Sequence, residues 1–388
     1  MHPAVYALAL AAFSVGTAEF IIAGLLPQLS TDLAVTIPTA GLLVTGYAVG
    51  VAVGSPIIAA LTARVPRRTM LLGVLAVFII GQVLCAIAPN YAALLAGRLL
   101  VSFAHGVFFG VSLIIIGALV PIERQGRAFG LLFSGLTLAT ILGVPGGTAI
   151  GTTFGWRTSF WFVGSLSALA TAAVAFLVPR QGADGEGHTA FGPQMRQLAK
   201  QEIYLSYLLI AFNALGFFAY LTYQVPLLLD VTHIDPAQVP IYLFIAGIGT
   251  VCGTFFSGRL TGDRLMPSLV VVMLLQAAVF LGLRLVAHSA IGVGIAMVLA
   301  GMAFGTFATP IQARIVAAAR EAPTMASTLI STAFNVGIAA GAFVGASLLR
   351  AGVGYDQLPL IGVGCSVLAA IVGLVSWRLE RRTVLAAA

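Results

Sequence analysis

Long apolar segments alternate with short polar ones along almost the whole chain. A membrane-spanning helix needs about 20 consecutive and mostly apolar residues. Twelve segments of that kind lie at approximately 3–26, 38–62, 69–88, 91–118, 127–150, 157–178, 204–229, 238–260, 267–287, 290–313, 324–349 and 358–378. The pattern therefore predicts an all-α membrane protein with twelve transmembrane helices.

Only one of the polar segments is long. Residues 180–203 are rich in glycine and charge, a composition typical of a flexible linker. We expect this segment to be a cytoplasmic linker. It would join an N-terminal six-helix bundle, residues 1–179, to a C-terminal six-helix bundle, residues 204–388.

The two halves resemble one another weakly at a nearly constant offset. Shifts of 198 to 200 residues match Gly143 with Gly341, Gly147 with Gly345, Ala104 with Ala303, Gly106 with Gly305, Phe108 with Phe307, and Arg64 with Arg264. Such repeats indicate two pseudo-symmetric bundles. The ionisable groups are not repeated, because Arg98 falls on Met297 and His105 falls on Phe304.

Composition and charge agree with a membrane location. Hydrophobic residues make up 60% of the chain and charged residues 8%, whereas soluble domains carry about 25% charged residues. The net charge of +7 could suggest nucleic acid, but most of the 19 Lys and Arg residues fall on one set of alternate loops and termini. Only Arg157, Arg284 and Arg350 fall on the other set. This bias predicts that both termini are cytoplasmic and gives no reason to expect a nucleic-acid partner.

Glu19 lies inside the first predicted span. A charge there costs ~2.5–3.5 kcal/mol on insertion scales, so by default it marks a functional site. Arg98, in the fourth span, lies at a comparable depth and is its best available partner, and His105 follows on the same helix face. Burial favours a neutral Glu19 and Arg98 favours its carboxylate, and this balance can differ between inward-open and outward-open states.

We therefore expect Glu19, Arg98 and His105 to couple transport to protons. Two alternatives stay open at this point. Glu19 and Arg98 could form a static pair that fixes helix packing. His105 could titrate, or it could be a neutral histidine that is hydrogen-bonded in the core.

Charged residues in two cytoplasmic loops are candidates for a gate. The loop between the second and third spans carries Arg64, Arg67 and Arg68, which can cap helix C-termini or bind acidic groups. Its counterpart in the second half carries Asp263 beside Arg264. We expect these charges to latch the cytoplasmic face. Positive-inside topology alone would explain the arginines but not Asp263.

The fifth span holds a glycine-rich segment that we expect to act as a hinge. Gly143, Gly146, Gly147 and Gly151 would allow close backbone approach, and Pro145 would permit a bend. Gly143, Pro145 and Gly147 are the predicted hinge residues. Tight helix packing along a seam between the halves is the structural side of the same prediction.

Aromatic and amide side chains inside the spans are candidates for a substrate site. A large cavity with few polar anchors suits a flat, moderately hydrophobic ligand. Each of these side chains could instead face lipid or fill the core. The candidates are Phe20, Tyr47, Phe108, Phe109, Asn213, Phe217, Tyr220, Gln224, Phe334 and Asn335.

Several motifs together resemble a known family over essentially the whole chain. They are GTAEFIIAGLLP (16–27), GRLLVSFAHG (97–106), LGVPGG (142–147) followed by GWRTSFW (155–161), and MASTLISTAFNVGIAAG (325–341). The chain resembles the twelve-helix drug:proton antiporter group of the major facilitator superfamily, and most closely the branch of arabinose-induced and sugar-efflux transporters and chloramphenicol exporters. The resemblance implies that Glu19 is the proton-linked carboxylate, Arg98 its coupling partner, and residues 143–147 a hinge that blocks leakage. It departs at Ala63 and Pro66, where the family has Asp and Gly, so Asp263 would carry more of the latch.

From the residues and the resemblance together we expect proton-coupled efflux by alternating access in the bacterial inner membrane. The substrate would be a small, moderately hydrophobic compound such as chloramphenicol, and the proton-motive force would replace any cofactor. Its partners would be the substrate, protons and the lipid bilayer, and the protein would be a monomer. The scattered histidines and unpaired cysteines suggest neither an enzyme with catalytic residues nor a metal site. The alternative is a sugar or metabolite transporter of the same fold, which the scarcity of polar intramembrane residues makes weaker.

Overall fold

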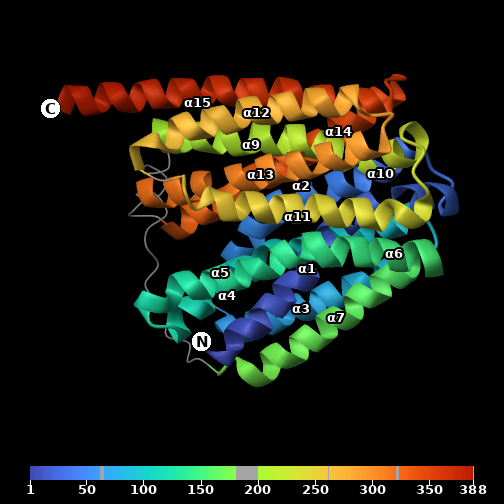
Figure 1. The fold of residues 1–388 in the computed structure, drawn as a ribbon. Helices are drawn as coiled ribbons and strands as arrows, with labels where there is room; N and C mark the ends of the chain where they lie inside the picture. Colours follow the sequence, from blue (N-terminus) through green and yellow to red (C-terminus); the bar gives the residue numbers. More distant parts are fainter. Residues whose placement is uncertain (62–64, 181–199, 261, 320–322, 388) are drawn as a thin grey trace. The chain divides into compact units, whose positions relative to one another are not determined.

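The computed structural model describes residues 1–61, 65–180, 200–260, 262–319 and 323–387. Its α-helices are α1 (Pro3–Asp32), α2 (Ile37–Leu61), α3 (Arg67–Ala86), α4 (Tyr91–Leu119), α5 (Ile122–Leu138), α6 (Val144–Phe154), α7 (Trp156–Leu177), α9 (Gln201–Leu221), α10 (Gln224–Pro226), α11 (Val239–Ser257), α12 (Leu265–Leu285), α13 (Ala290–Ala318), α14 (Pro323–Arg350) and α15 (Pro359–Ala387). Short π or 3-10 segments are η1 (Ala139–Gly143), η2 (Leu227–Val231), η3 (Pro236–Gln238), η4 (Gly262–Arg264) and η5 (Tyr355–Gln357). Figure 1 shows these elements along the chain.

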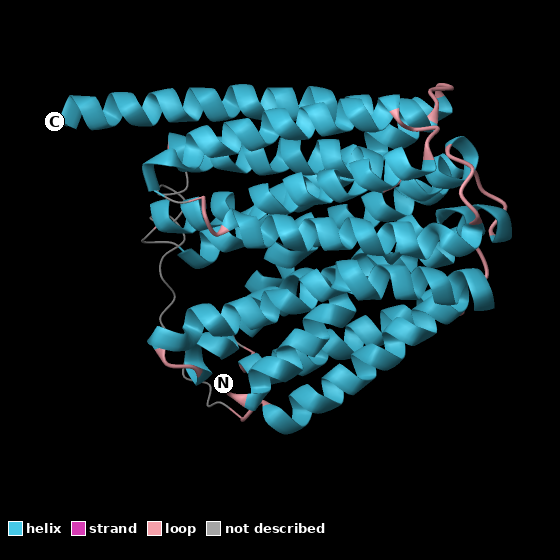
Figure 2. Cartoon of the chain, in the orientation of Figure 1, coloured by secondary structure: helices cyan, strands magenta, loops and turns pink. Residues whose placement is uncertain are grey.

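The architecture is all-helical, as the apolar segments predict. Within the described ranges, twelve helices are long and apolar enough to cross a membrane, and each coincides with one of the twelve predicted segments. Figure 2 shows helices joined by short loops, with no strand among the residues that are drawn in colour. The prediction of a twelve-helix fold is confirmed.

The chain divides into two compact units. Unit 1 comprises Met1–His188 with Pro236–Phe244, and unit 2 comprises Thr189–Asp235 with Ile245–Ala388. The cytoplasmic location of the linker and the bundle limits 1–179 and 204–388 stay predictions.

Glycine contacts repeat from one unit to the other. In unit 1, a side chain added at Gly143 would collide with Thr17 of α1. In unit 2, a side chain added at Gly341 would collide with the main-chain oxygen of Leu215 of α9. Gly341 lies 198 residues after Gly143, and Leu215 lies 198 residues after Thr17. The duplication inferred from the sequence therefore extends to the way in which the first and fifth helices of each unit pack.

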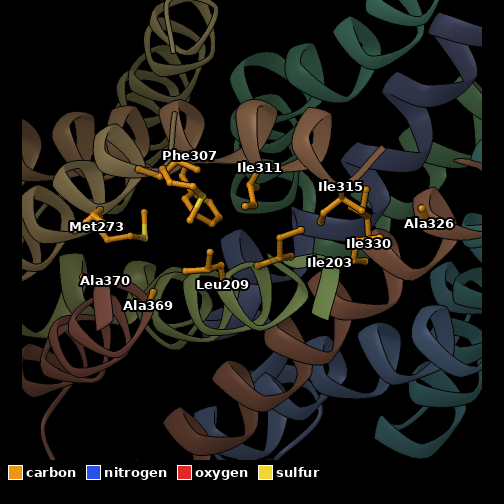
Figure 3. Packing of buried hydrophobic residues seen from close by; sticks show 14 of the residues in the cluster. Ile203, Leu209, Met273, Phe307, Ile311, Ile315, Ala326, Ile330, Ala369 and Ala370 are labelled. Carbon is orange, nitrogen blue, oxygen red and sulfur yellow. The ribbon is translucent and has the colours of Figure 1, made fainter. Parts of the chain in front are cut away.

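Large apolar side chains fill the interior of each helix bundle. In unit 2, side chains from five helices form one cluster, which is shown in Figure 3. Met273 of α12, Phe307 of α13 and Leu209 of α9 are each no more than 2% exposed. Other large apolar side chains are strongly exposed, among them Phe176 at 88% and Phe255 at 80%. In a membrane protein such side chains face lipid, which is as apolar as they are.

The glycine-rich segment of the fifth span changes helix type. α5 passes into the π-helical segment η1, which ends at Gly143, and α6 begins at Val144 with Pro145 in its first turn. Proline lacks a backbone N–H, so the preceding turn cannot complete a regular ladder of hydrogen bonds there. Gly147 lies against Ile21 of α1, whereas nothing lies within 4 Å of a side chain added at Gly146. The prediction of close approach is therefore wrong for Gly146, beside which the described residues leave open space.

Candidate functional site: a buried polar cluster on α1, α2 and α4

Glu19 lies in the middle of α1 and is only 6% exposed. The helix forms because its 30 residues are almost entirely apolar or small, and His2 caps its first turn by accepting a hydrogen bond from the Ala4 amide. Within the described part of the chain, no hydrogen bond or ion pair involves the Glu19 carboxylate. This carboxylate is therefore a buried acid to which no described side chain is hydrogen-bonded or ion-paired.

Arg98 of α4 is fully buried and binds the main chain of α1. One guanidinium nitrogen donates to the Ala18 carbonyl at 2.5 Å, and another donates to the main-chain carbonyl of Glu19 at 3.3 Å. A carbonyl oxygen has two lone pairs, so these groups can accept from Arg98 in addition to their bonds within the helix. Arg98 remains close enough to act electrostatically on the Glu19 carboxylate. The alternative of a static ion pair between the two side chains is not formed among the described residues, where Arg98 binds main-chain carbonyls through its two terminal nitrogens.

Tyr47 of α2 connects Arg98 with His105. The guanidinium carbon lies 4.0 Å from the centre of the Tyr47 ring, a cation–π contact. The Tyr47 hydroxyl and His105 Nδ1 are 3.0 Å apart, and either atom can be the donor, depending on the imidazole tautomer. Arg98 and His105 therefore share one face of α4, as their spacing of seven residues predicts. We call Glu19, Tyr47, Arg98 and His105 the polar cluster.

The aromatic candidates of unit 1 continue from this cluster along α4. The His105 and Phe109 rings are 5.4 Å apart, and Phe109 is stacked on Phe133 of α5 at 5.8 Å. Phe108 is almost completely buried and contacts Phe109 edge-on, so it fills the core of unit 1. Phe20 is partly exposed beside Glu19.

The aromatic candidates of unit 2 gather around a residue that was not among the predicted site residues. Phe217 of α9 is stacked on Phe304 of α13, with ring centres 4.1 Å apart. Phe218 and Phe334 of α14 contact the same ring at 6.2 and 6.1 Å. Phe304 could have been found from the sequence, because it is the counterpart of His105 at a shift of 199 residues. We call Phe217, Phe218, Phe304 and Phe334 the aromatic cluster.

Polar candidates of unit 2 differ in how well they are paired. Asn213 donates to Gln276 Oε1 of α12 at 2.8 Å, so its amide already serves a contact between helices. Asn335 donates to the Ser331 carbonyl at 3.0 Å, a bond within α14. By contrast, three buried oxygens make no hydrogen bond to described residues, namely Tyr220 Oη, Gln224 Oε1 and Asn335 Oδ1. These oxygens have unused capacity to accept a hydrogen bond.

The gate candidates are only partly described. Arg68 donates to the carbonyls of Val178 and Ala175 at 2.8 and 2.6 Å, so it caps the C-terminus of α7. Arg67 is half-buried and Arg264 is exposed. Arg64 and the side chain of Asp263 lie outside the described residues. The capping role is confirmed for Arg68, and the latch stays a prediction.

One charged cluster was not anticipated. Arg314 of α13 donates to Ser206 of α9, to Ser376 of α15 at 3.0 Å, and to the Glu380 carboxylate, with which it forms an ion pair. It therefore ties three helices of unit 2 together near their ends. The sequence signal was weak, because one arginine at the end of a span is what topology alone requires.

Comparison with known proteins places these features in a family. Residues 8–342 match the family model described as Major Facilitator Superfamily. The chain is 35% identical over 378 residues to the inner membrane transport protein YdhP of Escherichia coli K12, covering 97% of each chain. It is 34% identical over 346 residues to a chloramphenicol resistance protein of Streptomyces lividans, covering 89% of this chain and 88% of that one. A probable sugar efflux transporter of Helicobacter pylori is 30% identical over 353 residues, with 90% of each chain covered.

Solved structures agree at the level of the fold. A bacterial homologue of the human lysosomal transporter Spinster superposes with a TM-score of 0.75 at 19% identity, covering 96% of each chain. A D-xylose–proton symporter gives a TM-score of 0.74 at 14% identity, covering 94% of this chain and 96% of that one. At these identities the likeness concerns the arrangement of helices and not the substrate.

Proposed function

The chain belongs to the Major Facilitator Superfamily and is a multi-pass membrane transporter rather than an enzyme, and we propose that it exchanges protons for a small, moderately hydrophobic compound. The observation that best supports this proposal is that the Glu19 carboxylate is buried and bound by no described side chain. Arg98 lies beside it and is hydrogen-bonded to main-chain carbonyls of α1. An ionisable group inside a membrane bundle is a candidate proton carrier. A carboxylate without a fixed partner can exchange a proton with less rearrangement than one locked in an ion pair.

The proposed cycle uses Glu19 as the proton site. When the outer mouth is open, a proton from outside binds Glu19, and this favours release of the substrate. The protein then changes its access, and the proton leaves to the cytoplasm while new substrate enters. Arg98 supplies the fixed positive charge that favours the carboxylate when the site is unprotonated. Such a cycle lets the proton-motive force drive export without a cofactor.

The proposed substrate class rests on the aromatic cluster and on the efflux-type relatives. Stacked rings such as Phe217 and Phe304 offer flat apolar surface. Tyr220, Gln224 and Asn335 supply few polar anchors, which suits a flat and weakly polar ligand. Two relatives are named for chloramphenicol resistance and sugar efflux. We propose a chloramphenicol-like drug as the first compound to test.

A sugar or metabolite is the second candidate, favoured by the sugar-efflux relative. Sugars are recognised by many hydrogen bonds, and the unpaired buried polar atoms described in unit 2 are few. The two candidates differ in the compound that evokes proton movement, so a single assay separates them.

The proposed location is the bacterial inner membrane, with both termini in the cytoplasm and a monomer as the working unit. The clustering of arginines on one set of loops supports the orientation. Cysteine labelling from each side of the membrane, at single cysteines placed near Ala4 and Arg381, would test the orientation. Labelling of either site only from outside the cell would contradict it.

The experiment for the proposed function uses inside-out membrane vesicles with an imposed proton gradient and a pH-sensitive dye. Chloramphenicol, a panel of lipophilic drugs and a panel of sugars are added in turn. Wild type is compared with Glu19→Gln and with the control Glu123→Gln, which removes an exposed carboxylate at the start of α5. We expect drug-evoked proton release from wild type and from Glu123→Gln, and none from Glu19→Gln.

Each other outcome overturns a defined part of the proposal. If Glu19→Gln releases protons as wild type does, Glu19 is structural and the mechanism is wrong. If only sugars evoke release, the drug assignment is wrong and the second candidate replaces it. If no compound evokes release from wild type, proton-coupled export of these classes is refuted.

A further inference from the structure

Gln82 of α3 is a buried amide without a hydrogen-bond partner. Its side chain is 0% exposed, and neither Oε1 nor Nε2 is hydrogen-bonded to any described residue. Burial of an unpaired amide is unfavourable, so such a group calls for a physical reason. The site described above does not include it, and its sequence surroundings are uniformly apolar.

Gln82 lies on the same side of the α3–α4 contact as Arg98. Side chains added at Gly81 and Gly97 would come within 2.5 Å of Val101 and 2.8 Å of the Cys85 sulfur, so these glycines mark where the two helices touch. Gln82 follows Gly81 and Arg98 follows Gly97. The two helices form a hairpin and run antiparallel. In an antiparallel pair, the residues that follow the two contacting glycines are turned by about 100° toward the same flank of the contact, so Gln82 and Arg98 lie on that flank together. The Nε atom of Arg98 is also buried without a partner among the described residues.

The internal duplication gives both Gln82 and Glu19 a counterpart in unit 2. A side chain added at Gly164 would lie 3.4 Å from Gln82 Cβ, and one added at Gly362 would lie 2.6 Å from the Phe280 ring. Gly362 follows Gly164 by 198 residues, and Phe280 follows Gln82 by the same number. Phe280 is therefore the counterpart of Gln82.

Phe217 is the counterpart of Glu19 at the same shift, and the Phe280 and Phe217 rings are 6.5 Å apart. By analogy with this pair we infer that Gln82 and Glu19 face one another in unit 1, where no hydrogen bond between described residues yet satisfies the Gln82 amide. At this position the amide of Gln82 can both donate and accept a hydrogen bond, whereas Phe280 of unit 2 can do neither.

We propose that Gln82 is a positioning residue that links Arg98 to Glu19. Its Oε1 accepts from Arg98 Nε–H, and its amide N–H donates to the Glu19 carboxylate when the proton has left. When Glu19 is protonated, the amide releases it, and the carboxyl group is free to meet the next proton or to yield it. The proposal rests on Glu19 being the proton site, as proposed above. It adds that Arg98 acts on Glu19 through a third side chain as well as through space.

The experiment replaces Gln82 with methionine, which has a similar length and volume but no hydrogen-bonding amide. The matched control is Gln276→Met in unit 2, where the amide is also fully buried and its Nε2 is also unpaired. Both variants are reconstituted into vesicles beside wild type and Glu19→Gln. Four quantities are measured: drug binding, drug transport, protons released per drug molecule, and the thermal unfolding midpoint.

A structural role and a positioning role predict different results. If Gln82 only fills space, methionine removes an unpaired buried amide, so stability rises or stays equal and transport is unchanged. If Gln82 positions Glu19, Gln82→Met keeps drug affinity and stability but lowers the number of protons released per drug molecule at least several-fold. Gln276→Met keeps the wild-type ratio in either case. A variant Gln82→Asn, which restores an amide with both an acceptor oxygen and a donor N–H, is expected to recover part of the coupling.

The failure of this proposal is distinguishable from failure of the proposed function. If Glu19→Gln abolishes coupling but Gln82→Met has the wild-type ratio of protons to drug, only the role of Gln82 is refuted. If Glu19→Gln itself keeps the wild-type ratio, the proposed function falls and the role of Gln82 falls with it. If Gln82→Met loses drug binding together with coupling, Gln82 supports the fold or the substrate, and the positioning role is refuted.

Discussion

Two matched regions of the molecule carry opposite chemistry on the same scaffold. In unit 1, Glu19 and His105 belong to the polar cluster around Arg98. In unit 2, the counterparts of Glu19 and His105 are Phe217 and Phe304, which stack on one another at 4.1 Å. The glycine contacts between the first and fifth helices recur in both units. Helix packing was therefore kept after duplication, while the side chains at the centre diverged.

This difference suggests how one duplicated fold can serve two tasks. A polar cluster in a low-dielectric bundle is sensitive to a single proton, because each charge there is poorly screened. An aromatic cluster is insensitive to protons and offers contact area instead. In the proposed function, unit 1 handles the proton and unit 2 provides most of the surface for a flat substrate.

We expect the largest effect from exchanging Arg98 of unit 1 and its counterpart Met297 of unit 2. Arg98→Met gives unit 1 the residue of unit 2, and we expect transport to be lost without loss of stability. The reason is that Arg98 is bound mainly by main-chain carbonyls, which keep their helical bonds when it is removed. Met297→Arg buries a new charge without a partner, and we expect it to lower the free energy of unfolding by about 3–5 kcal/mol.

Drug-evoked proton release and thermal unfolding in detergent measure these two effects. Arg98→Lys is the control that keeps the charge but loses the planar fork that reaches two carbonyls. Full transport by Arg98→Met would show that unit 1 needs no fixed positive charge. The assignment of proton chemistry to unit 1 rather than unit 2 would then be refuted.

A smaller effect separates the two matched glycines. Gly143→Ala forces the Thr17 side chain to move, whereas Gly341→Ala presses against the main-chain oxygen of Leu215, which cannot turn away. We expect Gly341→Ala to lower the free energy of unfolding by about 1–3 kcal/mol and Gly143→Ala to lower it less. Gly146→Ala and Gly364→Ala are controls, because nothing lies within 4 Å of the added methyl group. Equal destabilisation by all four substitutions would mean that glycine content, not helix contact, explains the effect.

The smallest effect concerns two buried tyrosines. Tyr47→Phe removes the hydroxyl that meets His105 but keeps the ring against Arg98. Tyr223→Phe removes a hydrogen bond to the Ala342 carbonyl in unit 2. Each loss is expected to cost about 0.5–1.5 kcal/mol of stability, measured by thermal unfolding.

Only Tyr47→Phe is expected to alter transport as well, modestly, because only that hydroxyl belongs to the polar cluster. A change in the pH profile of transport for Tyr223→Phe, with none for Tyr47→Phe, would contradict the assignment of proton chemistry to unit 1.

The twelve helices, the duplication and the grouping of Glu19, Arg98 and His105 in unit 1 could be predicted from the amino-acid sequence. Apolar length predicts spans because a bilayer core has one thickness. The spacing of Arg98 and His105 predicts a shared face because the helix has one period. The same reasoning was wrong for Gly146, because a run of glycines does not reveal which side of the helix meets a neighbour.

Which side chains and carbonyls contact one another depends on how the helices pack in three dimensions. Arg98 binds carbonyls of α1 rather than the Glu19 carboxylate, and every residue has such a carbonyl, so this choice leaves no trace in the sequence. The position of Tyr47 between Arg98 and His105 depends on the packing of α2 against α4, which helical periodicity does not specify. Burial of the Gln82 amide likewise depends on how α3 meets α4 and α7. Periodicity defines the faces of each helix, and three-dimensional packing selects the faces that touch.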